Sequence, residues 1–511
     1  MFTDDQIYAI KQKAIETLKK KFSEGKDKEV ELLANQFLKV EEDNADILQV
    51  LGLIKYKNQD YKSSIELFEK ACSINPNNYE NYNNLGLCYA GLGKFDQSIE
   101  IIEKAIKINP DLDFLHSNLG LQLRNKKETL KAIECFKKAL SIKQTAETWG
   151  MLGGCYGELR DLNEAEKCFL ESLNINPKHA AAHVDLASIY HLKGEWERSW
   201  PEYEWRNELY EQTKFWEKIY DPKTKWNGKD DISQKRILIH SEQGTGDLIH
   251  FFRYVKFLKE KGAFVILHCW DSLKSLLESY VDEIYVKDPS EIPIFTARNS
   301  DFDIPKYDFQ CSIISLPYLL QLKHIPTEPY LSCKTTFNVQ DYSNYLKIGI
   351  VWAGNPQHPN DATRSCYLKD FKKIHDMPNV KLFNLQKDMR PRMYRFQENP
   401  IDLTEGTENM KIVDVSQFQT DFEKTAAIIN SMDLIATVDT AILHLAGAMN
   451  KKTFALISTN CDWRWKIEGK ENDWYPSVTL IRQKKLNDWS SVFEELELEI
   501  KNYNENNIQN K

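Results

Sequence analysis

The stretch Thr437–Gly447 has the sequence TVDTAILHLAG, and it predicts a strand, a tight turn and a helix in succession. The short apolar run Asp433–Val438 before the turn is typical of a buried parallel strand. Asp439 and Thr440 carry side chains that cap helices, so we expect a helix to begin at Ala441. A helix that starts at the carboxyl end of a parallel strand presents free N–H groups and a positive dipole end. Such a turn can bind an anion.

The expected roles within this turn divide between capping and ligand binding. Asp439 is itself an anion, so we expect it to cap the helix amides rather than touch a phosphate. The Thr440 hydroxyl, the first-turn amides of Ala441 and Ile442, and His444 are the expected phosphate and sugar contacts. The alternative is ordinary capping, with His444 as a satisfied core histidine that binds no ligand.

A second turn of the same kind lies earlier, in Arg236–His250, whose sequence is RILIHSEQGTGDLIH. Its first five residues predict a fully buried strand. The loop Gly244-Thr245-Gly246 contains two glycines, which let the backbone approach a ligand closely, so we expect this loop to face a cleft.

The segments after this loop complete a βαβ unit. We expect a helix at Leu248–Lys261 that ends at Gly262, and a strand at Ala263–His268. The turn falls short of a dinucleotide fingerprint, because its third position is Ile249 and no acidic residue ends the second strand. An NAD-dependent enzyme is therefore disfavoured.

Composition places the chain among soluble globular proteins of several domains. It has 511 residues, of which 42% are hydrophobic and 28% charged, and the formal charge of −9 argues against a nucleic-acid partner. No stretch approaches the roughly 18 apolar residues that a membrane span requires, and the first residues, MFTDDQIYAIKQ, lack the apolar core of a signal peptide. Ten cysteines lie scattered without a C-x-x-C pair, which predicts reduced thiols and a cytoplasmic protein, and supports neither a structural zinc site nor a disulfide framework.

The N-terminal third repeats itself with a period of about 34 residues. A Leu-Gly pair recurs, an alanine marks the second helix of successive units, and proline closes several units after Ile-Asn. The residues are Leu51-Gly52, Leu85-Gly86, Leu119-Gly120, Leu152-Gly153 and Leu186-Ala187; Ala71, Ala105 and Ala139; and Pro76, Pro110 and Pro177. The pattern resembles tetratricopeptide repeats. Small residues at Gly86 and Ala105 should allow two helices to pack closely.

The repeats define the domains of the first half of the chain. We expect an N-terminal helical cap at 1–44, an α-solenoid of repeats at 45–212 and a linker at 213–235. Such solenoids usually expose a concave surface to a protein segment, and the alternative is that they only dimerise or brace the rest. Aromatic residues crowd the region 195–231, which is typical of a core between domains. They are Trp196, Trp200, Tyr203, Trp205, Trp216 and Trp226.

The remainder predicts two α/β halves, at 236–337 and 346–495, followed by a tail at 496–511. Expected strands lie at 236–240, 263–268, 283–286, 308–314, 346–352, 381–385, 433–438, 453–457 and 479–481. Each half carries one of the two turns. Two nucleotide-type folds that face each other across a cleft suit a ligand with two ends. A nucleotide-sugar donor and a hydroxyl acceptor fit that description.

Three segments resemble the heptosyltransferase-type glycosyltransferases of the GT-B fold. Segment 236–254, with SEQGTGDLIHFFRY, is similar to their first half. Segment 346–365, which contains KIGIVWAGNPQHPNDATRS, is similar to the start of their second half, and segment 437–447 is similar to their donor-binding turn. Asp462-Trp-Arg-Trp465, Trp474-Tyr-Pro476 and Arg482-Gln483 resemble a bacterial branch with N-terminal tetratricopeptide repeats, which includes flagellin glycosyltransferases. The resemblance covers roughly residues 45–490.

The resemblance implies a role for each matching residue. Asp247, near the acceptor hydroxyl, would be the base, and Arg364 would reach the donor phosphates. The donor diphosphate would lie on the turn formed by Asp439, Thr440, Ala441, Ile442 and His444. Relatives carry lysine at the position of Arg364 and usually glycine at that of Ala441, so the donor stays open. ADP-heptose does not carry over, and a nonulosonic acid on a single phosphate is an alternative.

Glycosyl transfer needs a stabilised leaving phosphate and a hydroxyl that loses its proton. Arg364 and the 440–444 turn could stabilise the phosphate without a metal or another cofactor. Lys387, at the end of a strand, is a second candidate, and Asp301–Asp303 is expected to be solvated rather than metal-binding. Trp463 could stack on a base and Arg464 pair with a phosphate or carboxylate, unless the two form a packing cluster.

Two functions follow from these patterns. The first is a metal-independent glycosyltransferase that acts on a protein, such as flagellin at Ser or Thr, selected by the repeats. The second is a non-catalytic adaptor whose transferase fold binds a nucleotide sugar or a partner. Asp247 likewise has two interpretations, as a general base or only as the cap of the following helix.

Overall fold

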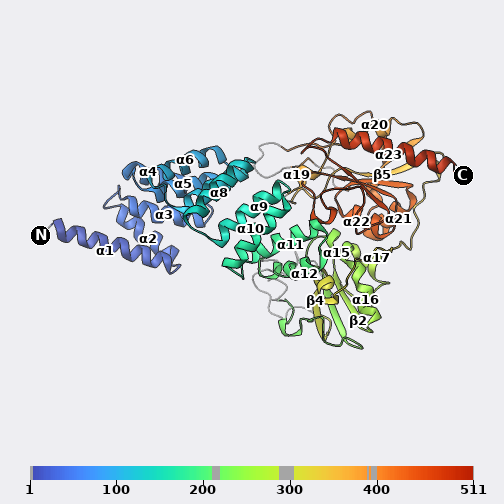
Figure 1. Ribbon diagram of the computed structural model, residues 1–511, viewed down its shortest axis with the longest axis horizontal. Helices are drawn as coiled ribbons and strands as arrows, with labels where there is room; N and C mark the ends of the chain where they lie inside the picture. Colours follow the sequence, from blue (N-terminus) through green and yellow to red (C-terminus); the bar gives the residue numbers. More distant parts are fainter. Residues whose placement is uncertain are drawn as a thin grey trace. The chain divides into compact units, whose positions relative to one another are not determined.

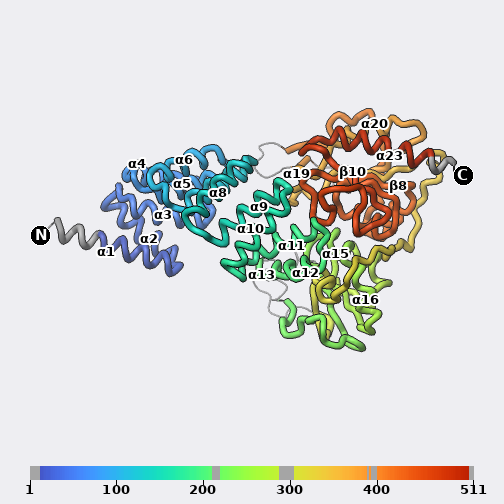
Figure 2. Tube along the Cα trace, viewed as in Figure 1, coloured from blue at the N-terminus to red at the C-terminus, as the bar shows by residue number. Residues whose placement is uncertain are grey.

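A computed structural model describes residues 4–209, 219–286, 304–358, 360–387, 391–392 and 400–509 (Figure 2). The chain divides into two compact units, Met1–Ala182 and His183–Lys511. Among the expectations above, Trp216 and Asp301–Asp303 lie outside the described residues.

The first unit is a stack of antiparallel helix pairs, as the repeats predict (Figure 1). A first pair lies where the helical cap is expected, and the repeat pairs follow. The helices are α1 (Asp4–Ser23), α2 (Asp27–Leu38), α3 (Ala45–Lys57), α4 (Tyr61–Ile74), α5 (Tyr79–Gly91), α6 (Phe95–Ile108), α7 (Asp113–Asn125), α8 (Thr129–Ile142), α9 (Ala146–Glu158) and α10 (Leu162–Ile175).

The recurring glycines explain how the two helices of a repeat come together. A β-carbon on Gly52 would lie 2.9 Å from the Phe68 ring, and one on Gly86 would lie 2.6 Å from Ile102 Cγ1. Real β-carbons do not approach so closely, so only glycine at these positions allows the two helices of a repeat to pack at this distance. The close packing predicted at Gly86 is confirmed.

The first helices of successive repeats also touch one another, α3 with α5, α5 with α7 and α7 with α9. Polar side chains join them: Asn118 Nδ2 donates to Asn83 Oδ1 at 2.8 Å, and Gln49 Nε2 donates to Glu80 Oε2 at 2.9 Å. Because these helices are neighbours along the stack, they line one continuous face of the solenoid.

The second unit opens with α11 (Ala180–Lys193), which begins just before the division, and continues with α12 (Trp196–Tyr203) and α13 (Arg206–Leu209). Trp200 and Tyr203 are buried and belong to the core of this unit. The expected end of the repeats at residue 212 therefore falls inside the second unit, because these aromatic rings pack onto the α/β part.

The first α/β half is a parallel sheet in the order β3-β2-β1-β4. Its strands are β1 (Arg236–His240), β2 (Phe264–Cys269), β3 (Glu283–Val286) and β4 (Phe309–Ser312), and its helices are α15 (Thr245–Phe251), α16 (Val255–Glu260), α17 (Asp271–Leu277) and α18 (Leu316–Leu320). The predicted helix 248–261 differs from these bounds. It starts at Thr245, and a 3-10 turn, Phe252–Tyr254, divides it.

The second half is a parallel sheet in the order β10-β9-β8-β5-β6-β7. Its strands are β5 (Leu346–Val351), β6 (Val380–Asn384), β7 (Val413–Asp414), β8 (Leu434–Val438), β9 (Thr453–Ile457) and β10 (Val478–Arg482). Its helices are α19 (Asp361–Arg364), α20 (Lys372–His375), α21 (Phe422–Ser431), α22 (Ala441–Ala448) and α23 (Ser490–Gln509), and α23 runs past α20 (Figure 2).

The strand order sets the place of a ligand. In the second sheet the chain moves outward from β5 through β6 to β7, then returns to the other side of β5 with β8. The loops after β5 and β8 therefore diverge and leave a crevice at the carboxyl edge, where doubly wound folds bind ligands. The two halves share one buried core, which joins Ile249 and Phe251 of α15 to Leu443 and Leu445 of α22.

Candidate active site

The first turn is built around the N-terminus of α15. Gly244 is the N-cap residue, and Asp247 is the third residue of the helix. Asp247 Oδ2 accepts a hydrogen bond from the Gly244 N–H at 2.9 Å. Asp247 therefore does cap its own helix, as the structural interpretation holds, and its side chain is only 22% exposed. Burial is the largest of the effects that raise the pKa of Asp247 above its ordinary value, and the Arg464 guanidinium opposes it.

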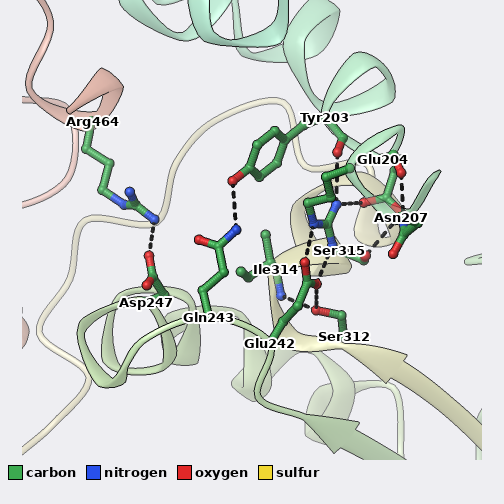
Figure 3. A network of polar contacts seen from close by, with 11 residues as sticks. Tyr203, Glu204, Asn207, Glu242, Gln243, Asp247, Ser312, Ile314, Ser315 and Arg464 are labelled. Carbon is green, nitrogen blue, oxygen red and sulfur yellow. Dashed lines mark hydrogen bonds and ion pairs between the residues drawn. The ribbon is translucent and has the colours of Figure 1, made fainter. Parts of the chain in front are cut away.

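A buried ion pair anchors the strand end that leads into this turn. Glu242 follows β1, and its two carboxylate oxygens accept hydrogen bonds from Arg206 Nε and Nη2, both at 2.8 Å. Ser312 at the end of β4 also donates to Glu242, and Ser315 accepts from Arg206 Nη2 at 2.8 Å (Figure 3). Arg206 is fully buried, so α13, the end of β1 and the end of the edge strand β4 are tied at one point.

Glu242 and Arg206 are not among the functional residues predicted from the sequence. A signal was present, since a glutamate directly after a buried strand needs a partner. Its partner lies 36 residues earlier in the chain, and no local pattern pairs the two.

The second turn has an open helix N-terminus. Thr440 is the N-cap residue of α22, with extended backbone, but no side chain caps the helix. Thr440 Oγ1 instead lies 3.2 Å from Thr437 Oγ1. The expectation that Asp439 caps the amides is therefore wrong. Asp439 lines a small cavity, and Ala441 and Ile442 at the helix start are partly exposed.

The two turns meet directly. A β-carbon on Gly246 would lie 3.1 Å from His444 Cδ2 and 3.4 Å from Ala441 Cα. The start of α15 thus packs closely on the first turn of α22 at Gly246. This contact brings Asp247 of the first half beside the anion-type turn of the second half.

His444 is a buried, neutral residue. Its Nδ1 lies 3.0 Å from Tyr475 Oη in a hydrogen bond, and its ring stacks on Trp465 with centroids 5.5 Å apart. Burial first, and then the guanidinium of Arg464, lower the pKa of His444 well below its ordinary value. His444 can therefore meet a ligand as a neutral imidazole, without contributing a positive charge.

The cavity beside Asp439 lies at the carboxyl ends of β5, β8 and β9, the crevice that the strand order predicts. Its lining residues are His358, Asn360, Arg364, Asp439, Ile457, Ser458, Asn460, Cys461, Asp462 and Trp465. Burial, followed by the Asp462 carboxylate, raises the pKa of Asp439 to about 6, and Arg364 opposes that rise. The cavity thus joins a guanidinium to two carboxylates.

Arg364 is held in the cavity wall by a buried acid. Its Nε donates to Asp361 Oδ1 at 3.2 Å, and Arg392 Nη1 donates to Asp361 Oδ2 at 2.9 Å. Asp361 is fully buried, and the Arg364 side chain is 17% exposed. A β-carbon on Gly354 would collide with the Arg364 guanidinium, so this glycine makes room for it.

Arg464 joins the two halves of the second unit. Its Nη2 donates to Asp247 Oδ1 at 2.5 Å (Figure 3). Its Nη1 donates to Asp462 Oδ1 at 2.9 Å. The side chain is 6% exposed. Its Nε is buried and has no hydrogen-bond partner in the described part of the chain. The sequence assigned Arg464 and Asp247 to separate sites, whereas the structure brings them into contact.

Trp463 shows the packing alternative that the sequence left open. Its ring stacks on His191 with centroids 4.0 Å apart, and the Arg464 guanidinium lies 4.2 Å from its centroid. Trp196 and Trp200 also contact the ring edge-on. Residues of the aromatic region thus surround Trp463.

Lys387 does not join this group. It is exposed after β6 and is not among the residues that line the cavity. Its role in donor binding stays a prediction. Another cavity, lined by Ile219, Asp221, Arg236 and Ile304–Asp308, lies at the opposite, amino-terminal edge of the first sheet. That edge carries none of the predicted site residues.

Two kinds of family pattern match the chain. Residues 402–485 match the sequence model of glycosyltransferase family 9 (heptosyltransferase), a segment that contains β8, the 437–447 turn and Arg464. Residues 52–93, 79–112, 115–145 and 146–179 match tetratricopeptide-repeat models. The matches support a repeat-containing glycosyltransferase. With the parallel sheets, they confirm the predicted fold class of a repeat solenoid followed by an α/β region, which is consistent with a GT-B-like domain of two Rossmann-like halves.

Several solved structures match part of the chain. A crystal structure of MamA shares 22% identity over 31% of this chain and 92% of that chain, with a TM-score of 0.28. A thermophilic TPR protein of Thermus thermophilus shares 22% identity over 35% of this chain and 97% of that chain, with a TM-score of 0.31. Pseudomonas aeruginosa pilF shares 15% identity over 39% of this chain and 91% of that chain, with a TM-score of 0.36. No curated protein matches the chain.

Three further findings concern the chemistry of the chain. In the part of the chain that the structure describes, no disulfide joins any two cysteines. Within the described ranges no cluster of His, Cys, Asp and Glu side chains is suited to hold a metal ion. None of the helices described has the length and apolar character needed to cross a membrane.

Proposed function

We propose that the second unit transfers a sugar from a nucleotide-sugar donor to a hydroxyl group of a protein, without a metal, and that the repeats select this protein. The observation that carries the proposal is the contact between the two turns. Gly246 lies against His444 and Ala441, which brings the Asp247 carboxylate to the helix start where a leaving phosphate would bind.

The donor side rests on the start of α22 and on Arg364. The helix dipole and the first amides, at Ala441 and Ile442, favour an anion, and the guanidinium on the cavity wall adds a full positive charge. Thr440 can add its hydroxyl, and the neutral His444 ring can donate or accept a hydrogen bond toward the sugar. These groups stabilise the charge that develops on the phosphate.

In the transfer step, the acceptor oxygen bonds to the anomeric carbon of the sugar. The bond between that carbon and the phosphate oxygen breaks, and its electron pair leaves with the nucleotide. Asp247 takes the proton of the acceptor hydroxyl. Asp247 Oδ2 accepts a hydrogen bond from the Gly244 N–H and Oδ1 accepts one from the Arg464 guanidinium, and these two bonds orient the carboxylate.

The acceptor side rests on the face formed by α3, α5, α7 and α9. Tyr79 at the start of α5 and Phe114 at the start of α7 form a ring pair with centroids 6.4 Å apart, and Phe114 is 39% exposed. Amide side chains on the same helices can bond to an extended peptide backbone. The resemblance implies flagellin Ser or Thr hydroxyls as the acceptor, and the scattered cysteines of the sequence favour the cytoplasm as the place of reaction.

Donor binding is tested with purified protein and the free nucleotides UDP, GDP, ADP and CMP. A bound nucleotide raises the thermal midpoint by mass action, which identifies the base. Hydrolysis of the matching nucleotide sugars, in buffer that contains EDTA, then tests for a metal-independent enzyme. Binding without any hydrolysis or transfer would favour the adaptor alternative.

Acceptor selection is tested on the repeat face. The double variant Tyr79→Ser, Phe114→Ser should lower transfer to the native protein acceptor and leave donor hydrolysis unchanged. Leu130→Ser is the matched control, because Leu130 is 69% exposed but belongs to α8, a second helix of a repeat. Equal transfer by the double variant and the control would remove this face from acceptor selection.

A further inference from the structure

We propose that Arg464 is the positioning residue of the base: it fixes the Asp247 carboxylate against the donor cavity by bridging Asp247 to Asp462. The proposal rests on the proposed function, since it concerns the same transfer. It gives Arg464 a role different from the ligand contact that the sequence predicts.

The geometry of the bridge carries the argument. Asp247 belongs to the first half and Asp462 to the second, and the Arg464 guanidinium lies between them at 2.5 and 2.9 Å. Arg464 is 6% exposed, so water does not screen the bridge. The Asp462 side chain also accepts a hydrogen bond from the Arg464 N–H at 3.0 Å, as the N-cap of the 3-10 turn Trp463–Trp465. A planar guanidinium with two donating edges suits this task better than a lysine ammonium.

Positioning matters because Asp247 has few other constraints. The Gly244 N–H fixes Oδ2, but a single hydrogen bond leaves the carboxylate free to rotate about it. The second bond, from Arg464 to Oδ1, sets the plane of the carboxylate and hence the direction from which an acceptor hydroxyl can approach. A base displaced by about 1 Å loses about 100-fold in rate.

Several charged or titratable groups face Asp247. Arg464 lowers the pKa of Asp247, whereas burial, Asp462 and Glu242 raise it. His358, from the loop after β5, has a pKa below its ordinary value because of burial and Arg364, so it faces Asp247 as a neutral ring. Arg464 is therefore the one cation among these groups that keeps Asp247 ionised.

The test is the pH profile of kcat/KM for donor turnover in Arg464→Met and Arg464→Lys, with Arg236→Gln as control. Arg236 pairs with Glu283 at 2.6 Å at the amino end of β1, on the opposite edge of the sheet. Loss of the cation should raise the pKa of Asp247, so the acid limb of Arg464→Met should move up by about 1–3 pH units. Its kcat should fall about 100-fold.

The two remaining variants complete the design. Arg464→Lys keeps a charge but cannot reach both carboxylates in one plane, so kcat should fall while the acid limb moves less. Arg236→Gln should retain the wild-type kcat and the wild-type acid limb of the pH profile. If Arg464→Met does not fold, as a melting curve will show, Arg464→Lys alone decides the question.

The outcomes separate the two proposals. A wild-type acid limb and kcat in the Arg464 variants, or a change in donor KM alone, would overturn the positioning role and leave Arg464 as a structural or donor-binding residue. Failure of the wild-type protein to turn over any donor would overturn the proposed function itself, and the role of Arg464 with it.

Discussion

Gly246 and His444 are in close contact: an added β-carbon on residue 246 would lie 3.1 Å from His444 Cδ2, tighter than ordinary β-carbon contacts. One residue belongs to the first α/β half and the other to the second. This pair therefore sets how closely the candidate base, one residue after Gly246, approaches the donor turn.

A side chain at residue 246 should push the two turns apart. We expect Gly246→Val to lower kcat/KM for donor turnover by about 100-fold, because a small displacement of Asp247 misaligns it. The kcat/KM of Gly246→Ala should lie between those of Gly246→Val and the wild-type protein. The thermal midpoint of each variant, measured alongside the rate, separates a folding defect from misalignment of Asp247. A Val variant with the wild-type rate would show that the contact does not position the site.

Asp247→Asn separates the base from the cap. Asparagine caps a helix nearly as well as aspartate, so a purely structural Asp247 would leave the rate close to normal. Loss of a general base should lower kcat by about 10²–10⁴-fold while the donor dissociation constant holds. The variant also leaves Arg464 with one carboxylate, Asp462, so the thermal midpoint should be measured alongside the rate.

Arg364→Ala should weaken nucleotide binding with little loss of folding. A charge-assisted contact to phosphate contributes about 1.5–3 kcal/mol, which corresponds to a dissociation constant raised roughly 10- to 150-fold. Calorimetric titration with the nucleotide identified by thermal shift measures it. Lys387→Ala tests the exposed lysine in the same assay. Unchanged affinity in both variants would leave phosphate binding to the start of α22.

The sequence predicted the architecture well, because periodicity and caps are local. The repeats, the strands of both sheets except the short edge strand β7, and the 437–447 strand–turn–helix follow from patterns within about 34 residues of one another. The bridge of Arg464 to Asp247 spans 217 residues and could not be predicted, since nothing local pairs them. The place of Asp439 was likewise not predictable from local pattern, since it lines a cavity together with Asp462, which comes from another loop.

The buried pair of Arg206 and Glu242 should be a determinant of stability. Glu242→Gln leaves a fully buried guanidinium with less compensation, and we expect a loss of about 3–5 kcal/mol in the free energy of unfolding. Arg206→Met should cost a similar amount. The double variant should lose less than the sum, because neither charge is then left alone. Urea denaturation of the four proteins measures the coupling, and strict additivity would contradict it.

Asp439 should make stability depend on pH between about 4 and 6. Its pKa is raised from 3.8 to about 6 in the folded protein, by burial and by Asp462. The folded state therefore binds a proton that the unfolded state has already lost in this range. Stability from this group is complete below pH 4 and declines as the pH rises through 6. Asp439→Asn removes that decline, so its thermal midpoint should gain on the wild-type protein between pH 4 and 7. Asp462→Asn should reduce the same slope, because it removes the carboxylate that raises the pKa. If the midpoints of Asp439→Asn and the wild-type protein run parallel from pH 4 to 7, Asp439 is ionised throughout and the two carboxylates are not coupled.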